Sequence, residues 1–511
     1  MGTSLDQAFS THSGKPIEPL VFGLPKEIDS VCPACSKVVK ALLYPESGKV
    51  WIRKACQEHG EFKDIFYGDA DLYLRCESLW FGDGRGVSNP AVRDASACPM
   101  GCGLCDRHSS HSGLPIVDLT NRCDLNCPMC FASAGSSNGP VYEPSFEQVT
   151  RMLEGLSAQK PVSANRVQLS GGEPTLRPDF LDIVRKAKEL DFFYIQVNTN
   201  GLRMADFEFA QAAKEAGVEA LYLQFDGLSD EVYRKTRGRP LLDKKLAAIE
   251  NCGKLRIAVT LVPTVIRGVN DHEVGAIAKF AARNYNAVRG LTFQPVSFMG
   301  RYSQSYRLQR RYTLGDLAHD LDMIEPMRDW LPVGACVAFS RLAEAMSGTP
   351  HLNISLHPHC AQGCYLYVCE DGTAVPFSAF VDMDALLRDV AKLSTELKPT
   401  SFGPLSKVKV LYTLQKHFHR ERAPKGLTFE GLLQSAEGFQ EKRFRKFFDE
   451  KRQYRHFYLS GMHFMDGYNF SLERLRRCVI HHPAPDGRLY PFCAYNGIPG
   501  YRKAVESRFH A

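Results

Sequence analysis

Three cysteines lie close together between residues 121 and 131, at the spacing C-x3-C-x2-C. They are Cys123, Cys127 and Cys130. Three thiolates at this spacing can hold three irons of a [4Fe–4S] cube. No fourth cysteine follows in the same run, so one iron would keep an open coordination site. Zinc sites usually show pairs of ligands that close to four, and the spacing therefore favours an iron–sulfur cluster over a zinc knuckle.

A second group of chemically useful residues falls at the ends of predicted strands downstream. These residues are Gly171, Gly172, Glu173, Pro174, Asn198, Asn200 and Asp226. Each follows a short apolar run of the length expected for a β-strand. The loop of residues 171–174 alone would indicate only a turn. Its place about 40 residues after the cysteines gives it more weight.

The elements that must position these residues alternate along the chain. Strands are predicted at residues 114–119, 166–170, 193–197, 220–226, 255–262 and 290–296. Helices are predicted between them, including residues 145–156, 178–190, 206–216 and 271–282. This alternation predicts an α/β fold with a parallel sheet and crossover helices. We interpret residues 112–300 as a partial (βα)6 barrel, whose strand carboxyl ends are where such barrels carry out chemistry.

The cysteine run and the loop 171–174, in this order, resemble the radical S-adenosylmethionine (SAM) enzymes. The resemblance implies that the open iron chelates the amino and carboxylate groups of SAM. It also implies that the reduced cluster passes an electron to the sulfonium and releases a 5′-deoxyadenosyl radical. On the same basis the backbone of the loop Gly171–Pro174 and the Glu173 side chain are expected to orient the SAM amino group, and Asn200 is expected to touch the ribose. Asn198 is expected among the polar contacts to SAM, and Asp226 at the same rim.

The N-terminal region carries a separate candidate metal site. Cys32 and Cys35 form one pair, and Cys56 and His59 form a second pair about twenty residues later. This spacing predicts a rubredoxin-like or ribbon-like domain with one mononuclear metal. Tetrahedral sulfur ligands suit zinc and iron equally, so the metal stays open between them. Spacing favours His59 as the fourth ligand, whereas a four-thiolate site would need Cys76.

A second C-x3-C-x2-C run precedes the predicted barrel. It consists of Cys98, Cys102 and Cys105, and it ends eighteen residues before the first cysteine of the later run. Because it does not follow the first strand, it is the poorer candidate for binding SAM. We interpret it as three ligands of an auxiliary [4Fe–4S] cluster. Cys76, His108 or a substrate atom remains open as the fourth ligand.

The C-terminal third contains six more cysteines. Four of them are the preferred ligands of a second auxiliary cluster: Cys336, Cys360, Cys478 and Cys493. Cys364 and Cys369 lie near enough in sequence to compete for this role. A single cysteine of this kind is more often a buried apolar thiol than a ligand.

Over nearly its whole length the chain resembles one radical SAM family, which includes archaeal tetraether synthase and members that methylate a hydroxymethyl-dihydropterin. The shared motifs are the N-terminal pairs, the run at 98–105, and residues 120–131, 224–227, 268–271 and 462–496. The pair Cys364 and Cys369 is additional to the family pattern. Resemblance implies carbon–carbon bond formation at unactivated carbon, by coupling lipid alkyl chains or, alternatively, by C-methylation of a pterin. It also implies a small reducing protein of the flavodoxin or ferredoxin type as partner. An electron carrier or scaffold without catalysis would need neither the loop 171–174 nor an open iron.

Composition sets the broader limits. At 511 residues, two to four domains are expected. We predict a metal-binding domain at 1–80, an auxiliary cluster segment at 81–111, the barrel at 112–300 and a C-terminal auxiliary iron–sulfur and substrate domain at 301–511. Seventeen cysteines without a recognisable secretory signal indicate a reducing compartment, so the cytoplasm is expected. No apolar run reaches the roughly 18–20 residues that span a bilayer.

Charge bears on the partners. The formal net charge of +6 is too small to indicate a nucleic-acid partner. Basic residues alternate with aromatic residues between positions 442 and 455, which is typical of a helix at an anionic lipid surface. The alternative is a solvated helix whose phenylalanines face the core. The first interpretation predicts peripheral contact with a membrane.

Overall fold

The computed structural model describes residues 18–93, 97–135, 140–300, 306–322, 330–369, 373–397, 403–436 and 455–509. At its centre lie six neighbouring parallel strands. They are β5 (Leu114–Thr120), β6 (Arg166–Gly171), β7 (Tyr194–Thr199), β8 (Ala220–Gln224), β9 (Ala258–Val262) and β11 (Val288–Pro295). The strands are joined in chain order, which confirms the predicted partial (βα)6 barrel.

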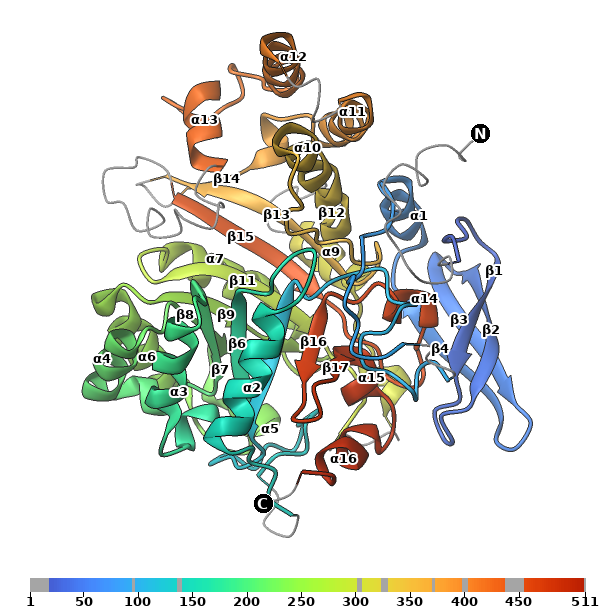
Figure 1. Cartoon of the computed structure of the whole chain (residues 1–511), viewed down its shortest axis with the longest axis vertical. Coiled ribbons are helices and arrows are strands. Elements are labelled where there is room, and N and C mark those ends of the chain that lie inside the picture. Colours follow the sequence, from blue (N-terminus) through green and yellow to red (C-terminus); the bar gives the residue numbers. More distant parts are fainter. Residues whose placement is uncertain are drawn as a thin grey trace.

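Helices cover one face of this sheet, as Figure 1 shows. They are α2 (Phe146–Ser157), α3 (Phe180–Glu189), α4 (Phe207–Ala216), α6 (Leu242–Leu255) and α7 (Val274–Arg283). Side chains alternate along each strand, so Val167 and Leu169 of β6 join the apolar core under the helices. Gln168 and Ser170 are buried on the opposite face. The barrel therefore has an apolar outer layer and a polar inner face.

Local chemistry fixes where the first crossover helix begins. Ser145 accepts a hydrogen bond from the backbone of Gln148, and the Gln148 side chain accepts one from the backbone of Ser145. This reciprocal pair is a capping box, and such a cap stabilises a helix by about 1 kcal/mol. It starts α2 at Phe146, one residue after the predicted start.

The C-terminal third extends the central sheet at both edges. β15 (Arg455–Met462) pairs in parallel with β11, and β16 (Ile480–Pro483) pairs in parallel with β5. β13 (Ala361–Val368) adds to β15 in antiparallel fashion, and β17 (Leu489–Pro491) adds to β16. The short strands β12 (Leu331–Pro332) and β14 (Ala374–Pro376) flank β13. The sheet thus continues across the boundary predicted at residue 300.

Before the barrel, residues 26–67 form a separate antiparallel sheet. Its strands are β1 (Lys26–Val31), β2 (Val38–Glu46), β3 (Lys49–Cys56) and β4 (Gly60–Tyr67), in that order. Ser47 and Gly48 join β2 to β3 with φ angles of 51° and 72°. Positive φ at both positions is the geometry of a two-residue hairpin turn. Helix α1 (Ala70–Ser78) follows, with the Asp69 side chain as its cap.

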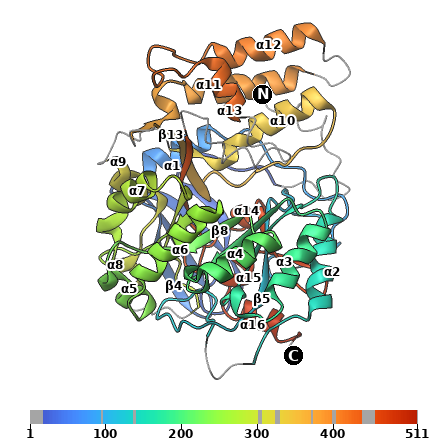
Figure 2. The same cartoon turned by 90° about the vertical axis from the view of Figure 1, so that its left-hand side faces the viewer.

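A small helical lobe stands at one end of the molecule (Figures 1 and 2). It consists of α10 (Val337–Ser347), α11 (Met383–Glu396), α12 (Pro404–Gln415) and α13 (Phe429–Ala436). An apolar cluster of its own holds it together, with Leu342, Phe380 and Val390 at its centre. The basic segment predicted at 442–455 lies outside the described residues, except for Arg455 at the start of β15.

One buried arginine links three distant parts of the chain. Arg311 donates to Asp64 of β4 over 2.6 Å and to Asp466 over 2.7 Å. None of the three side chains is more than 1% exposed. Two carboxylates around one guanidinium satisfy a charge that would be costly to bury alone. The N-terminal sheet is therefore fastened to the C-terminal region through this residue.

Candidate functional site

The cysteine run follows β5 directly and forms a loop at the carboxyl end of the sheet. Cys127 is buried, Cys123 and Cys130 are half-buried, and all three belong to one apolar cluster with Tyr233 and Leu241. Burial raises the pKa of the Cys123 thiol to about 12. Three cysteine sulfurs on one loop are the donor set that an iron–sulfur cluster requires. The residues present therefore fit the predicted cluster.

The loop after β6 braces the cysteine loop through its backbone. The amide of Gly172 donates to the Thr120 carbonyl over 2.7 Å, and the amide of Glu173 donates to the Arg122 carbonyl over 2.8 Å. A Cβ at Gly171 would lie 2.2 Å from the Thr120 oxygen, and one at Gly172 would lie 2.2 Å from the Arg122 oxygen. Only glycine permits this approach, which explains both glycines physically.

The Glu173 carboxylate is fully buried and engaged within the protein. It accepts hydrogen bonds from the hydroxyls of Thr175 (2.5 Å) and Thr199 (2.9 Å) and from the amide of Asn200 (2.8 Å). Burial raises the pKa of this carboxyl, although the three donors oppose the shift. The side chain thus ties the β6 loop to the end of β7. Its contact with the SAM amino group stays a prediction.

Of the two predicted asparagines, Asn198 lies within β7, whereas Asn200 follows β7 and supports the cysteine loop. The Asn200 amide donates to Asp124, inside the cysteine run, over 2.6 Å. Its oxygen accepts from the amide of Leu202 over 2.9 Å. Asn198 donates to Ser170 over 3.0 Å. Asn200 is 8% exposed. Its contact with the ribose stays a prediction.

Asp226 pairs with an arginine that the sequence did not single out. Arg237, the last residue of α5 (Asp230–Arg237), donates to Asp226 over 2.6 Å and 2.9 Å in a two-pronged contact. Burial alone would lower the pKa of Arg237. The neighbouring Asp226 carboxylate has the larger effect and raises the pKa, and Cys127 raises it further. The guanidinium therefore lies against both the strand-end carboxylate and a cysteine of the loop.

A buried lysine completes this rim. Lys245 donates to the carbonyl of Asn200 over 2.5 Å and to the Gln224 side chain over 2.8 Å. Burial lowers the pKa of Lys245 to about 7. Nothing in the sequence distinguishes Arg237 or Lys245 from a solvated helix residue. Only the packing of α5 and α6 against the strand ends brings them to the site.

Polar side chains line the inner face of the barrel. Gln168, Gln196, Thr292 and Ser460 are all buried there. Thr292 and Ser460 are hydrogen-bonded over 3.0 Å, across the pairing of β11 with β15. The Gln294 amide donates to the Tyr222 hydroxyl over 3.1 Å. This interior suits a ligand with hydrogen-bonding groups of its own.

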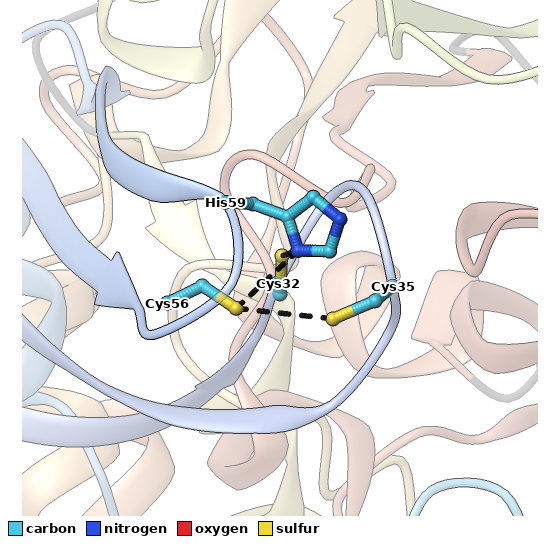
Figure 3. Close-up of side chains that lie close together, drawn as sticks. All are labelled: Cys32, Cys35, Cys56 and His59. Atoms are coloured by element: carbon cyan, nitrogen blue, oxygen red, sulfur yellow. Dashed lines mark hydrogen bonds between the residues drawn. The ribbon is translucent and has the colours of Figure 1, made fainter.

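The N-terminal candidate metal site is formed as predicted by the sequence spacing. The ligand atoms of Cys32, Cys35, Cys56 and His59 all lie within 4.8 Å of one another (Figure 3). The sulfurs of Cys35 and Cys56 are 3.8 Å apart, and His59 Nδ1 lies 3.5 Å from the Cys56 sulfur. Cys76 is buried elsewhere, where its sulfur accepts from Gln362 over 2.9 Å.

The chemistry of these four groups suits a mononuclear metal. The hydrogen bond from His59 lowers the pKa of the Cys56 thiol to about 6, which favours the thiolate that a metal requires. Three sulfurs and one imidazole nitrogen are a usual donor set for a structural zinc ion. The structure therefore places His59, rather than Cys76, beside the three thiols.

Five of the predicted auxiliary cysteines share one apolar cluster. Its cysteines are Cys98, Cys102, Cys360, Cys478 and Cys493. Burial raises the pKa of the Cys478 thiol to about 12, and the neighbouring Cys360 adds to the shift. Arg474 donates to the Cys360 sulfur over 3.4 Å, so this group also has an arginine that the sequence did not single out. The fold thus brings cysteines that precede the barrel in the sequence into one cluster with cysteines that follow it.

The remaining members of the predicted sets occupy other positions. Cys336 is an exposed residue at the start of α10. It lies near Tyr365 and Tyr458, and its charge adds to the effect of burial in raising the pKa of both tyrosines. Its role as fourth ligand stays a prediction. Cys364 is part of β13, and Cys369 follows that strand.

The fourth ligand of the 98–105 group also remains open. Cys105 is buried near Cys98, whose charge contributes to raising the pKa of Cys105 after burial itself. The ring nitrogen Nε2 of His108 lies 2.8 Å from the Cys478 carbonyl, to which it donates. His108 is thus hydrogen-bonded to Cys478, and Cys76 to Gln362, so neither side chain is bonded to these thiols.

Two phenylalanines join the cysteine loop to the auxiliary group. Phe131 follows Cys130, Phe492 precedes Cys493, and the two ring centroids are 5.6 Å apart. The pairing of β16 with β5 holds the two segments in place. A cluster on the loop and one on the tail would therefore be neighbours across a layer of aromatic side chains.

Comparison with known proteins gives matches over nearly the whole chain. Residues 117–281 match the family described as "Radical SAM superfamily", and residues 24–68 match "HMPTM N-terminal zinc ribbon domain". A protein of Methanocaldococcus jannaschii named 7,8-dihydro-6-hydroxymethylpterin dimethyltransferase is 38% identical over 493 residues. This alignment covers 95% of each chain.

More distant proteins match a third to less than half of the chain. A probable GTP 3′,8-cyclase of Pyrococcus abyssi is 30% identical over 168 residues, which are 33% of this chain and 52% of the cyclase. The structure of SuiB from Streptococcus suis, bound to its precursor peptide SuiA, covers 42% of this chain and 46% of its own. Its sequence identity is 16% and its TM-score is 0.34. Within the described residues, no helix combines the length and the apolar character needed to span a bilayer.

Proposed function

We propose that the chain, which belongs to the radical SAM superfamily, forms carbon–carbon bonds at unactivated carbon atoms of lipid alkyl chains. The chain is an enzyme with a radical SAM barrel and an N-terminal zinc ribbon. The contact between Phe131 and Phe492 supports radical chemistry that uses an auxiliary cluster, whichever of the two substrates is bound. It sets the cysteine loop beside a second group of buried cysteines.

The protein's own residues prepare the site for this chemistry. Cys123, Cys127 and Cys130 would hold a [4Fe–4S] cluster, which with SAM would supply the radical chemistry that an unactivated C–H bond requires. The loop after β6 and the Asn200 side chain fix the cysteine loop. Apolar packing against Tyr233 and Leu241 buries Cys127.

We assign the other cysteines to two auxiliary clusters. Cys98, Cys102 and Cys105 hold one, and Cys360, Cys478 and Cys493 hold the other, with Cys336 as its proposed fourth ligand. Anaerobically reconstituted protein should then contain three [4Fe–4S] clusters and one mononuclear metal. Iron and sulfide analysis with Mössbauer spectroscopy tests this assignment. About four irons in total would show that the auxiliary cysteines are structural thiols.

Lipid coupling has a defined stoichiometry. Joining two alkyl chains removes one hydrogen atom from each and forms one carbon–carbon bond. It consumes two SAM molecules and two electrons, and it yields two methionines and two 5′-deoxyadenosines. We propose that a small protein of the flavodoxin or ferredoxin type delivers the electrons. The resemblance to tetraether synthase, carried by motifs from residue 32 to residue 496, supports the lipid as substrate.

C-methylation of a pterin is the second candidate. The name of the Methanocaldococcus jannaschii relative favours it, and so does the polar inner face of the barrel. An alkyl chain would leave Gln168 and Gln196 without new partners, whereas the edge of a pterin ring carries donors and acceptors that match them.

One experiment separates the two candidates. The full chain is expressed with a reducing partner in a host whose core lipids and pterins are followed by mass spectrometry. Lipid chains joined with the loss of two hydrogens per link support coupling. An unchanged lipid profile with a methylated pterin favours the second candidate. The Cys127→Ala variant should give neither product, whereas Cys252→Ala, in the core of α6, should behave like the parent protein.

A further inference from the structure

Helix α12 has apolar residues on both of its faces. Val410 and Thr413 are buried against the helical lobe. On the opposite side Leu405, Val408 and Tyr412 are 86%, 64% and 66% exposed. Their spacing of three and four residues places them on one face of the helix, and Leu411, at 48% exposure, borders them. A surface helix ordinarily has a single apolar stripe, directed to the core.

This concentration of exposed apolar side chains is particular to α12. Among the helices that the structure describes, each of the others has at most one large apolar residue with comparable exposure. Single exposed apolar residues are normal on protein surfaces, but a contiguous patch marks a site of interaction. The outer face of α12 therefore has the character of a binding surface.

The charge around this face identifies the kind of partner. Lys407 and Lys409 alternate with the exposed apolar residues. Residues 403–425 contain six lysines and arginines and a single acidic residue, Glu421. Lys409 pairs with Glu396 and Lys416 with Asp389, both on α11, whereas Lys407 is exposed beside the apolar face. Apolar residues flanked by lysines match a bilayer with acidic headgroups.

The position of α12 leaves this face free to approach a flat surface. Both views place α12 at the outer end of the helical lobe, on the side away from the barrel (Figures 1 and 2). A convex helix that ends the molecule can lie on a plane without obstruction. With 12 residues it is too short to cross a bilayer, which needs about 20.

We propose that the outer face of α12 docks the protein on an anionic lipid bilayer, with Leu405, Val408 and Tyr412 entering the interface. The proposal deepens the proposed function and rests on it, because an enzyme that joins lipid chains must reach a membrane. It names a surface within the described residues, distinct from the basic segment at 442–455.

Vesicle sedimentation of the full, cluster-loaded protein tests the proposal. The probes are phosphatidylcholine vesicles with and without about 30% phosphatidylglycerol. The parent protein should bind the anionic vesicles, and binding should weaken as salt increases. The triple variant Leu405→Ser, Val408→Ser, Tyr412→Ser should bind at least about tenfold more weakly, because an interfacial helix is held by its buried apolar area.

Matched controls test whether weaker vesicle binding follows from the loss of any exposed apolar side chains or of any positive charge, rather than from those on α12. The control triple variant Phe207→Ser, Leu246→Ser, Leu308→Ser removes residues that are 43%, 38% and 48% exposed elsewhere, and it should bind like the parent. Lys407→Glu should weaken binding to anionic vesicles, whereas Lys244→Glu on α6 should not. All variants should form 5′-deoxyadenosine at the parent rate with dithionite as reductant, which shows that they fold and bind SAM.

Several results would overturn the proposal. Equal vesicle binding by the parent and the α12 triple variant would remove this face from the interface. A parent dimer that the triple variant converts to a monomer would identify the face as a contact between two copies. Joined lipids from a protein without vesicle affinity would refute docking while upholding lipid coupling. Vesicle binding without any lipid product would uphold docking and refute the proposed substrate.

Discussion

The N-terminal metal site and the cysteine loop of the barrel are built in opposite ways. The first takes all its ligands from two turns of one small antiparallel sheet, between Cys32 and His59. The second has its three cysteines on one loop, but the loop is held by segments that arrive much later in the sequence. Thr199, Asn200 and Arg237 belong to β7, its following loop and α5. The first site depends on local pairing, and the second depends on closure of the barrel.

The largest expected effect comes from the loop cysteines themselves. Cys127→Ala should abolish 5′-deoxyadenosine formation, because two thiolates cannot hold the cluster that cleaves SAM. Cys102→Ala, in the auxiliary group, should retain SAM cleavage without product. High-performance liquid chromatography of the nucleosides gives the answer. Cleavage that persists in Cys127→Ala would remove this loop from the SAM site.

Breaking the barrel support should have the next largest effect. Arg237→Leu leaves Asp226 buried without its partner, which costs about 3–5 kcal/mol of folding free energy. Urea unfolding measures this cost, and SAM cleavage should fall with it. Metal content at Cys32, Cys35, Cys56 and His59 should stay unchanged. Simultaneous loss of that metal would show that the two sites do not fold independently.

A pair of glycine variants tests the backbone brace. Gly172→Ala brings a Cβ against the Arg122 carbonyl and should destabilise the protein by about 1–3 kcal/mol, with slower SAM cleavage. Gly155→Ala on α2 meets open space and should stabilise it by about 0.5–1 kcal/mol. Thermal unfolding compares the two. Similar behaviour of both variants would contradict the close approach of the two loops.

The smallest effect on catalysis should come from the N-terminal site. His59→Ala removes one of four ligands, so metal analysis should show weakened retention under chelator. Formation of 5′-deoxyadenosine should remain close to that of the parent, because the ribbon contributes no residue to the SAM site among the described contacts. A loss as large as that of Cys127→Ala would mean that the barrel depends on the ribbon.

Sequence predicted what is local in both regions. Spacing alone placed the ribbon ligands, and alternation of apolar runs with helices gave the six strands of the barrel. The identity of His59 as the fourth group agrees with the shorter spacing. These features depend on neighbours in the chain, so the sequence contains the information directly.

Long-range pairing was out of reach. The strands β15 and β16 were not recognised as edges of the barrel sheet, because their partners lie more than a hundred residues away. Arg237 and Arg474 were missed for the same reason, since a buried arginine looks like a solvated one until its helix is placed. The predicted contacts of Glu173 and Asn200 with SAM remain predictions, and both side chains are bonded within the protein.

The bridge formed by Arg311 sets an order of events during synthesis. Asp64 precedes Arg311 by 247 residues, and Asp466 follows Arg311 by 155. At about 5–20 residues per second, the ribbon leaves the ribosome roughly 20–80 s before its last partner. It therefore has time to fold and take up its metal as a free unit. Its docking through Arg311 requires Asp466, which is made last. The N-terminal and C-terminal parts of the chain therefore come together only at the end of synthesis.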